Sequence, residues 1–216
     1  MNKILISIVI LLSSQLTFSY DMSLITKEWQ KNPFELYLNA KEAYDMKTAN
    51  PDKVLLLDVR NQAELHYTGM PDSADANVPY RFDSSNWKLK KNKKHITFKM
   101  PKNPNFVEAV ENVLNDKNLT KESSVIIMCA TGSRAPFATR LLHKAGFKKV
   151  YAQMEGFEGP KSKEEGPNKG KRVVKGWKVS NLPWSYDLIP EKMYYNFDPI
   201  ERAEKKEKLT KGKAES

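Results

Sequence analysis

Short, continuous apolar runs recur along the first two thirds of the chain. The clearest are "KVLLLDV" at 53–59, "SSVIIMC" at 123–129 and "KKVYAQ" at 148–153. Runs of this kind, without an alternating polar face, are typical of strands buried on both faces of a parallel sheet. We expect two further short strands, at 35–38 and in "ADANVPY", where Pro79 ends the second one.

Between these runs the apolar residues have helical spacing. A helix is predicted after Asn39, because Glu42 follows three residues later and completes a capping box. Another follows Asn105, a candidate cap, and a third spans 133–146 and is closed by Gly146. Strands alternating with helices predict an α/β domain with a mainly parallel central sheet flanked by helices.

The N-terminal segment has the pattern of a secretory signal peptide. Lys3 precedes an apolar run from Ile4 to Leu12, and small or polar residues follow up to Tyr20. The apolar run is short for a membrane span, although an uncleaved anchor is the alternative. We therefore assign 1–19 as a signal peptide and expect an exported chain without a membrane span, periplasmic if the source is a Gram-negative bacterium.

The remaining chain divides by composition. We expect the domain at 20–160, interrupted by a polar, lysine-rich insertion at 81–104. After it, 161–199 is rich in Lys, Gly and Pro but also in aromatic residues, which predicts an extended arm packed on the domain. The last stretch, 200–216, is charged and predicts a disordered tail, with a lone charged helix as the alternative.

The basic charge is local. The formal net charge is +10, and 88–102 alone carries seven lysines and no acidic residue. This arrangement differs from the groove with interleaved aromatic residues that single-stranded nucleic acid requires, so no nucleic-acid partner is expected. A solvated loop and a patch that binds anions or a partner both remain open for the insertion.

Cys129 is the one cysteine of the chain. In an exported protein it cannot close an internal disulfide, and it excludes cysteine-cluster metal sites and c-type haem attachment. The three histidines, His66, His95 and His143, are scattered along the sequence. We expect no metal and no cofactor.

The residues after the cysteine predict a reactive site. Cys129 ends a strand and precedes a helix, which places it at the edge of the sheet where ligands bind in parallel α/β folds. Small residues let the backbone curl so that its N–H groups and the helix N-terminus stabilise a thiolate, together with Arg134. The alternative is an inert core cysteine. The small residues are Ala130, Thr131, Gly132 and Ser133.

These segments resemble the rhodanese (thiosulfate sulfurtransferase) domain family. "CATGSR" at 129–134 is similar to its active-site loop. "VLLLDVRNQAEL" is similar to the family's strand that ends in Asp-Val-Arg, and "GFKKVYAQMEGFEG" resembles the strand and glycine-containing turn after the active-site helix. The extension "GKRVVKGWKVSNLPWSYDL" resembles that of exported single-domain rhodaneses found near sulfur-oxidation systems. The resemblance covers about 35–198 and implies a rhodanese-like three-layer domain with sulfurtransferase activity.

The resemblance also implies roles for individual residues. Cys129 would be the nucleophile that becomes a persulfide, cradled by the backbone N–H groups of Ala130 to Arg134, with Arg134 helping to hold the anionic donor. Asp58 and Arg60 match the family's Asp-Val-Arg motif, as an ion-paired scaffold or a substrate contact, and Glu64 would stabilise a helix. The implied partners are small sulfur anions and a sulfur-relay protein.

The chain also departs from the family. Ala130 stands where many members have arginine, which favours polysulfide or a protein persulfide over thiosulfate as donor. The usual turn with a histidine is replaced by "TGMPDSA", so His66 receives no role. Two other functions remain as alternatives: a persulfide carrier with little turnover alone, and a phosphatase or arsenate reductase. The second is disfavoured because phosphatases of this fold have a loop one residue longer and because no general acid is evident in the sequence.

Overall fold

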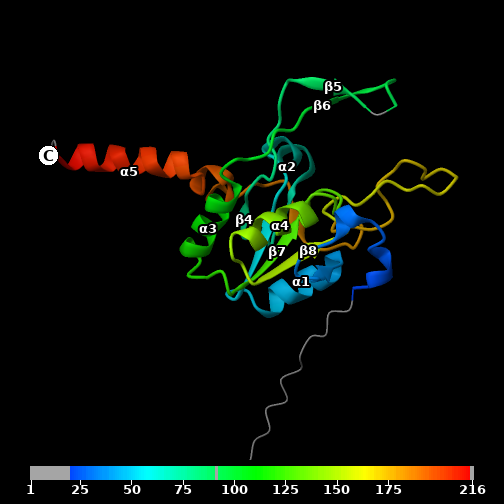
Figure 1. Ribbon diagram of the computed structural model, residues 1–216, viewed down its shortest axis with the longest axis horizontal. Helices are drawn as coiled ribbons and strands as arrows, with labels where there is room; N and C mark the ends of the chain where they lie inside the picture. Colours follow the sequence, from blue (N-terminus) through cyan, green and yellow to red (C-terminus); the bar gives the residue numbers. More distant parts are fainter. Residues whose placement is uncertain (1–19, 91, 215–216) are drawn as a thin grey trace, which may run out of the picture.

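The computed structural model describes residues 20–90 and 92–214, with side chains as far as residue 208 in the last helix. The segment predicted to be a signal peptide, 1–19, lies outside the described residues. Five strands form the central sheet, in the order β1-β8-β7-β2-β4, and every pair is parallel. The predicted α/β fold is therefore confirmed (Figure 1). The strands are β1 (Tyr37–Leu38), β2 (Val54–Asp58), β4 (Ala76–Asn77), β7 (Ser124–Met128) and β8 (Lys149–Gln153).

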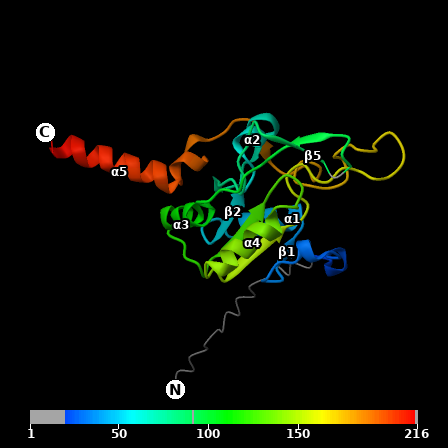
Figure 2. The same ribbon diagram turned by 45° about the horizontal axis from the view of Figure 1, so that its top comes forward.

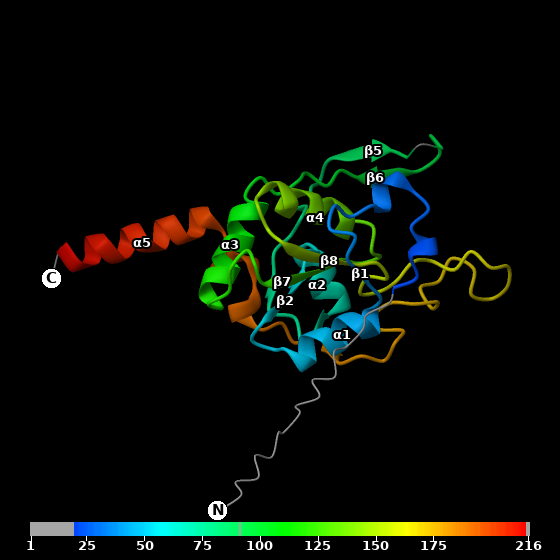
Figure 3. The ribbon, with the colours of Figure 1, turned by 60° about the horizontal axis from the view of Figure 1, so that its bottom comes forward.

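Helices cover both faces of the sheet. Alternate residues of β7 enter different hydrophobic cores, Val125 and Ile127 on one face and Ile126 and Met128 on the other. Helices α3 and α4 pack on the first face, and α1, α2 and part of the arm pack on the second. Figure 3 shows the sheet between α4 and α1. The helices are α1 (Ala40–Ala49), α2 (Gln62–Thr68), α3 (Phe106–Asp116) and α4 (Ala135–Lys144).

One predicted helix cap is present and another is not. Asn39 and Glu42 form the expected capping box at the start of α1. Asn105 occupies the cap position of α3, but its side chain makes no capping hydrogen bond, since its backbone (φ −94°, ψ 12°) is not in the extended conformation typical of a cap. Helix α4 begins at Ala135, two residues later than the start predicted at Ser133, because the preceding loop curls back on itself.

The insertion contains a β-hairpin that the sequence did not predict. Strands β5 (Trp87–Leu89) and β6 (Ile96–Phe98) pair antiparallel and project away from the domain (Figure 1). A second antiparallel pair, β3 (Met70–Pro71) and β9 (Trp184–Ser185), joins the arm to the domain. Four short 3₁₀ helices complete the described residues at Met22–Leu24, Glu28–Gln30, Pro190–Lys192 and Tyr194–Asn196.

The C-terminal stretch contains helix α5 (Pro199–Ala214), the alternative considered for this segment, and Arg202 of this helix is paired with Asp116 of α3. Figure 2 shows it extending away from the sheet. Within residues 20–90 and 92–214, no helix has the length and apolar character needed to cross a membrane.

Candidate active site

Cys129 lies where two central strands end together. It follows Met128, the last residue of β7, and Met128 is in register with Asp58, the last residue of β2. Since all strands of the sheet are parallel, this is the carboxyl edge, where open α/β sheets bind ligands. The thiol itself is fully buried, in the core on the α3 and α4 face.

The loop after Cys129 turns its backbone toward the sulfur. The N–H group of Arg134, the residue at the start of α4, donates a hydrogen bond to Cys129 Sγ at 3.3 Å. The hydroxyl groups of Thr131 and Ser133 are hydrogen-bonded to each other at 3.1 Å, across the middle of the loop. A sulfur at this position therefore meets a backbone donor and the positive end of a helix dipole.

Two glycines allow the loop to take this shape. Gly132 has φ +79°, and a Cβ atom there would lie 1.8 Å from the carbonyl oxygen of Met154. Gly156 has φ +76°, and a Cβ atom there would lie 2.3 Å from the backbone nitrogen of Thr131. The positive φ that the sequence allowed at Gly132 is present, and close contact with the turn after β8 requires it.

The turn after β8 supports the loop through backbone hydrogen bonds. The N–H of Phe157 donates to the carbonyl oxygen of Cys129 at 2.7 Å. The N–H groups of Glu158 and Gly159 both donate to the carbonyl oxygen of Ala130 at 3.0 Å. These bonds use the carbonyl oxygens of Cys129 and Ala130 rather than the N–H groups of the loop, which are the donors that an anion site requires.

The aromatic arm holds the turn after β8 through backbone hydrogen bonds. The N–H of Trp177 donates to the carbonyl oxygen of Gly156 at 2.9 Å, and the N–H of Lys178 donates to that of Phe157 at 3.0 Å. Trp177 is fully buried, and the ammonium of Lys178 lies 3.6 Å above the ring of Trp184. The arm therefore contacts the residues that hold the Cys129 loop.

Asp58 and Arg60 form a buried ion pair beside the loop. Arg60 Nε lies 2.9 Å and 3.0 Å from the two carboxylate oxygens of Asp58, and neither side chain is exposed. The guanidinium also donates to Thr68 Oγ1 and to the carbonyl oxygen of Gly69, both at 2.7 Å, and lies 4.0 Å from the ring centroid of Phe157. Of the two roles considered for this pair, the geometry is that of a scaffold.

Arg134 is paired with Glu64, a contact that the sequence reasoning missed. Its guanidinium binds both carboxylate oxygens of Glu64, one of them at 2.7 Å and the other through Nη2. Glu64 also completes the capping box of α2, accepting from the N–H of Asn61 at 3.0 Å. Glu64 and Arg134 are 70 positions apart in the sequence, so no local pattern predicts their contact.

The pair changes the electrostatics of the site. Burial alone would raise the pKa of Glu64, but the hydrogen bonds and charge of Arg134 outweigh it and hold that pKa below its ordinary value. Burial opposes the charge of Arg134, yet the bonds to Glu64 keep its pKa above the usual range. The charges of Arg60 and Arg134 are therefore both compensated by carboxylates, and Ala130 contributes no positive charge to the loop.

The described residues contain no cluster of histidine, cysteine and carboxylate side chains that could hold a metal ion. The chemistry that the geometry supports is that of a single thiol held against a backbone donor.

Burial of the thiol has a measurable consequence. We expect Cys129 in the folded protein to react with a bulky aromatic disulfide reagent at least ~10-fold more slowly than in the urea-unfolded chain, because reaction requires local opening of the loop. Stopped-flow absorbance measures both rates, and the small reagent iodoacetamide should show a smaller difference. Equal rates in the folded and unfolded chain would contradict the buried position.

Comparison with known proteins places these features in a family. The sequence model described as "Rhodanese-like domain" matches residues 39–163. The uncharacterized protein RP600 of Rickettsia prowazekii is 28% identical over 145 residues, which cover 67% of this chain and 93% of that protein. The crystal structure of Rv0390 from M. tuberculosis is 24% identical and superposes with a TM-score of 0.52, covering 71% of this chain and 99% of its own. That similarity confirms the fold.

Proposed function

The chain belongs to the rhodanese-like domain family, and we propose on this basis that it is a sulfurtransferase whose Cys129 carries the transferred sulfur as a persulfide. The observation that carries the proposal is the hydrogen bond from the Arg134 N–H to Cys129 Sγ, in a loop at the carboxyl edge of the sheet. The signal-like pattern of 1–19 supports a further proposal, that the chain acts after export.

The proposed reaction has two balanced steps. The Cys129 thiolate attacks the sulfane sulfur of a donor, so that a new S–S bond forms while the bond to the donor's leaving group breaks and its electron pair departs with that group. The product is an enzyme persulfide, whose negative charge lies on the outer sulfur. An acceptor thiolate or cyanide then attacks that outer sulfur and releases the Cys129 thiolate.

The loop is suited to hold the charged intermediate. The Arg134 N–H at the N-terminus of α4 already donates to Cys129 Sγ, so a backbone donor and the positive end of the helix dipole lie beside the sulfur that carries the persulfide. In the proposed first step a thiolate attacks and no proton is transferred, so this step calls for no histidine or carboxylate general base.

The charge balance of the site supports a particular class of donor. Glu64 compensates Arg134 and Asp58 compensates Arg60, so neither cation is free to hold the sulfonate group of thiosulfate, a group that persulfides and polysulfides lack. With Ala130 in place of arginine, the loop offers mainly backbone dipoles. We therefore propose that a persulfide or polysulfide, including one carried by a relay protein, is a better donor than thiosulfate.

The central experiment is intact mass spectrometry of the reduced protein before and after a donor is added. Wild type should gain one sulfur atom from inorganic polysulfide, and cyanide should remove it as thiocyanate. Cys129→Ser, the matched control, should gain none. Wild type that gains no sulfur from polysulfide, thiosulfate or a small-molecule persulfide would contradict the proposal.

A second measurement distinguishes an enzyme from a persulfide carrier. Both form the Cys129 persulfide, but a carrier would keep it in the presence of excess cyanide or small thiols, whereas an enzyme would turn over. The burial of Cys129 is the feature that favours the carrier. Multiple turnovers with a small acceptor would exclude it.

Restoring the missing positive charge should change donor preference. Ala130→Arg is expected to raise kcat/KM for thiosulfate roughly tenfold, through attraction of the dianion, with a smaller effect on an organic persulfide, which carries one negative charge rather than two. Steady-state rates with both donors measure the ratio. Asn115→Arg on the exposed surface of α3 adds the same charge elsewhere and should leave it unchanged. An equal increase with both donors would contradict the electrostatic explanation.

A further inference from the structure

The hairpin in the insertion has one fully apolar face. Trp87 is in register with Phe98, and Leu89 with Ile96. Because side chains alternate along a strand and cross-strand partners share a face, these four side chains lie together on one side of the ribbon. They are 58%, 61%, 55% and 54% exposed, in the order named, and none belongs to a hydrophobic core.

The opposite face and the tip of the hairpin are basic. Lys88 pairs with Thr97 on that face, between the two apolar pairs. No acidic residue occurs between Asp83 and Glu108, a stretch that contains seven lysines. None of the lysines that the structure describes in this stretch takes part in an ion pair. Their charge is therefore available to an external anionic surface.

The hairpin is built to stand away from the domain. Its strands are joined to each other, and the hydrogen bonds at its tip and base, from Lys90 N to His95 O and from Lys99 N to Asn86 O, both at 2.7 Å, also stay within it. Figures 1 and 3 both show it projecting from the body of the molecule. A contiguous, exposed apolar face on a projecting element marks an interaction site.

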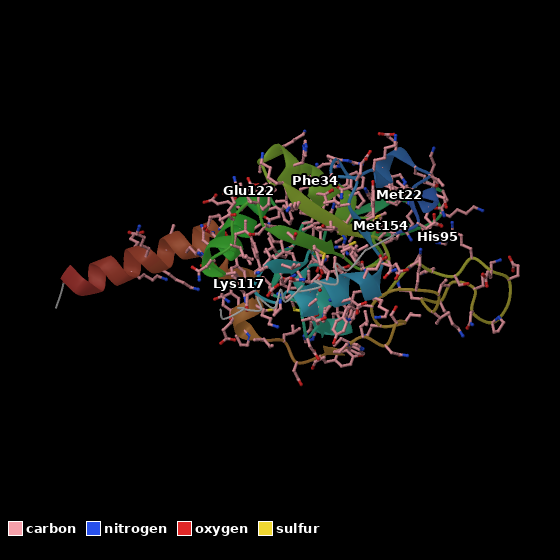
Figure 4. All side chains as sticks on the ribbon, turned by 90° about the horizontal axis from the view of Figure 1, so that it is seen from below. Met22, Phe34, His95, Lys117, Glu122 and Met154 are labelled. Atoms are coloured by element: carbon pink, nitrogen blue, oxygen red, sulfur yellow. The ribbon has the colours of Figure 1, made fainter. Side chains whose placement is uncertain are left out.

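The hairpin segment and the Cys129 loop both begin at the carboxyl edge of the sheet. The hairpin segment follows the carboxyl end of β4, next to the carboxyl end of β2. Figure 4 shows His95 of the hairpin and Met154, just after β8, toward one end of the molecule, whereas Lys117 and Glu122, which precede β7, lie toward the other. Whatever binds the hairpin therefore lies on the side of the candidate site.

We propose that this hairpin docks the protein on an anionic lipid bilayer, with Trp87, Leu89, Ile96 and Phe98 inserted at the interface and the lysines bound to headgroups. Aromatic and aliphatic residues on one face and lysines on the other are the composition of interfacial membrane-binding elements. The lysine stems reach past the apolar face to the headgroup level.

Other occupants fit less well. Protein interfaces are depleted in lysine, which is the commonest residue in 88–102. Nucleic acid would need aromatic rings and cations on the same face, but here they lie on opposite faces. A second copy of the chain would bring two lysine clusters together, and their repulsion opposes such a dimer.

Docking would hold the Cys129 loop close to the bilayer surface. Asp83, at the base of the hairpin, accepts a hydrogen bond from Asn61 Nδ2 at 2.7 Å, and Asn61 shares its capping box with Glu64, the partner of Arg134. The proposal does not depend on sulfur transfer, because membrane binding is measured without any sulfur donor.

The experiment is co-sedimentation of the full chain, after removal of the signal segment, with vesicles. Wild type should sediment with phosphatidylglycerol vesicles and not with phosphatidylcholine vesicles, and high salt should weaken the binding. Trp87→Ser with Phe98→Ser should reduce the partition coefficient at least ~10-fold. Lys88→Gln, Lys90→Gln and Lys99→Gln together should reduce it on the order of 100-fold.

Matched controls use exposed residues of the loop at 161–176. Val173→Ser with Val174→Ser removes apolar surface elsewhere, and Lys161→Gln, Lys163→Gln and Lys171→Gln remove the same charge. Both sets should bind anionic vesicles like wild type. Failure of wild type to bind phosphatidylglycerol vesicles in low salt would overturn the proposal and favour a protein partner for the hairpin. Equal loss in the control sets would overturn it too, since binding would then be unspecific adsorption.

Discussion

Replacing Arg60 by alanine is expected to lower the free energy of unfolding by about 3–5 kcal/mol. The change leaves the carboxylate of Asp58 fully buried without its cation. It also removes the hydrogen bonds to Thr68 and Gly69, and the packing of the guanidinium on the ring of Phe157. Because the Phe157 N–H holds the carbonyl oxygen of Cys129, persulfide formation should weaken as well.

Urea unfolding followed by circular dichroism measures the change. Lys41→Ala, which removes an exposed ion pair with Asp45, is the control and should cost less than about 1 kcal/mol. The double variant Asp58→Leu, Arg60→Met should be clearly more stable than Arg60→Ala, because no charge remains buried. If the double variant were less stable than Arg60→Ala, an unpaired charge would not be the cause.

The sequence was sufficient for the central architecture because its signals are local. Continuous apolar runs identified β2, β7 and β8, and the Asn39 capping box identified the start of α1. The position of Cys129 at the end of a strand also followed from its neighbours alone. In each case the residues that determine the structure lie within one element or the turn beside it.

The features that the sequence did not predict depend on contacts between distant segments. The sequence around Glu64 predicts only a role in capping a helix, and its contact with Arg134 arises only when the chain has folded. The hairpin was missed because lysines interrupt its apolar residues, so that Trp87, Leu89, Ile96 and Phe98 form a face only once the two strands pair. The arm was expected to pack on the domain, but its bonds to the turn behind the Cys129 loop have no sequence signal.

The two segments that support the Cys129 loop from behind, the turn after β8 and the arm, explain why the loop itself consists mostly of small residues. The loop receives its shape from the turn at 153–159, which in turn is held by Trp177 and Lys178. Rigid support of this kind is what a preorganised anion site requires. Small residues in the loop are then sufficient, and the specific side chains lie behind it.

Glu64→Gln is expected to lower kcat/KM for sulfur transfer on the order of 10–100-fold, with a loss of about 2 kcal/mol in the free energy of unfolding. Glutamine at this position keeps the capping box of α2, so the helix should remain. What is lost is the charge-assisted pair that fixes Arg134, whose N–H donates to Cys129 Sγ. Glu64 is thus a positioning residue.

The pH dependence distinguishes this role from a general loss of packing. Arg134 holds the pKa of Glu64 below its ordinary value of 4.5, so the folded chain binds fewer protons here than the unfolded chain. The stabilisation is therefore fully present above pH 4.5 and is lost as the pH falls through the lower folded-state pKa. The stability difference between wild type and Glu64→Gln should be constant near neutral pH and shrink in acid.

Urea unfolding of both proteins across this pH range measures the difference directly. Glu122→Gln, at an exposed position before β7, is the control and should match wild type throughout. A gap that stays unchanged in strong acid would mean that the carboxylate charge is not what Glu64 contributes. Because glutamine cannot ionise and the other carboxylates are common to both proteins, only the wild-type curve should carry the contribution of Glu64 to the acid transition, and that asymmetry assigns the effect to the ion pair with Arg134.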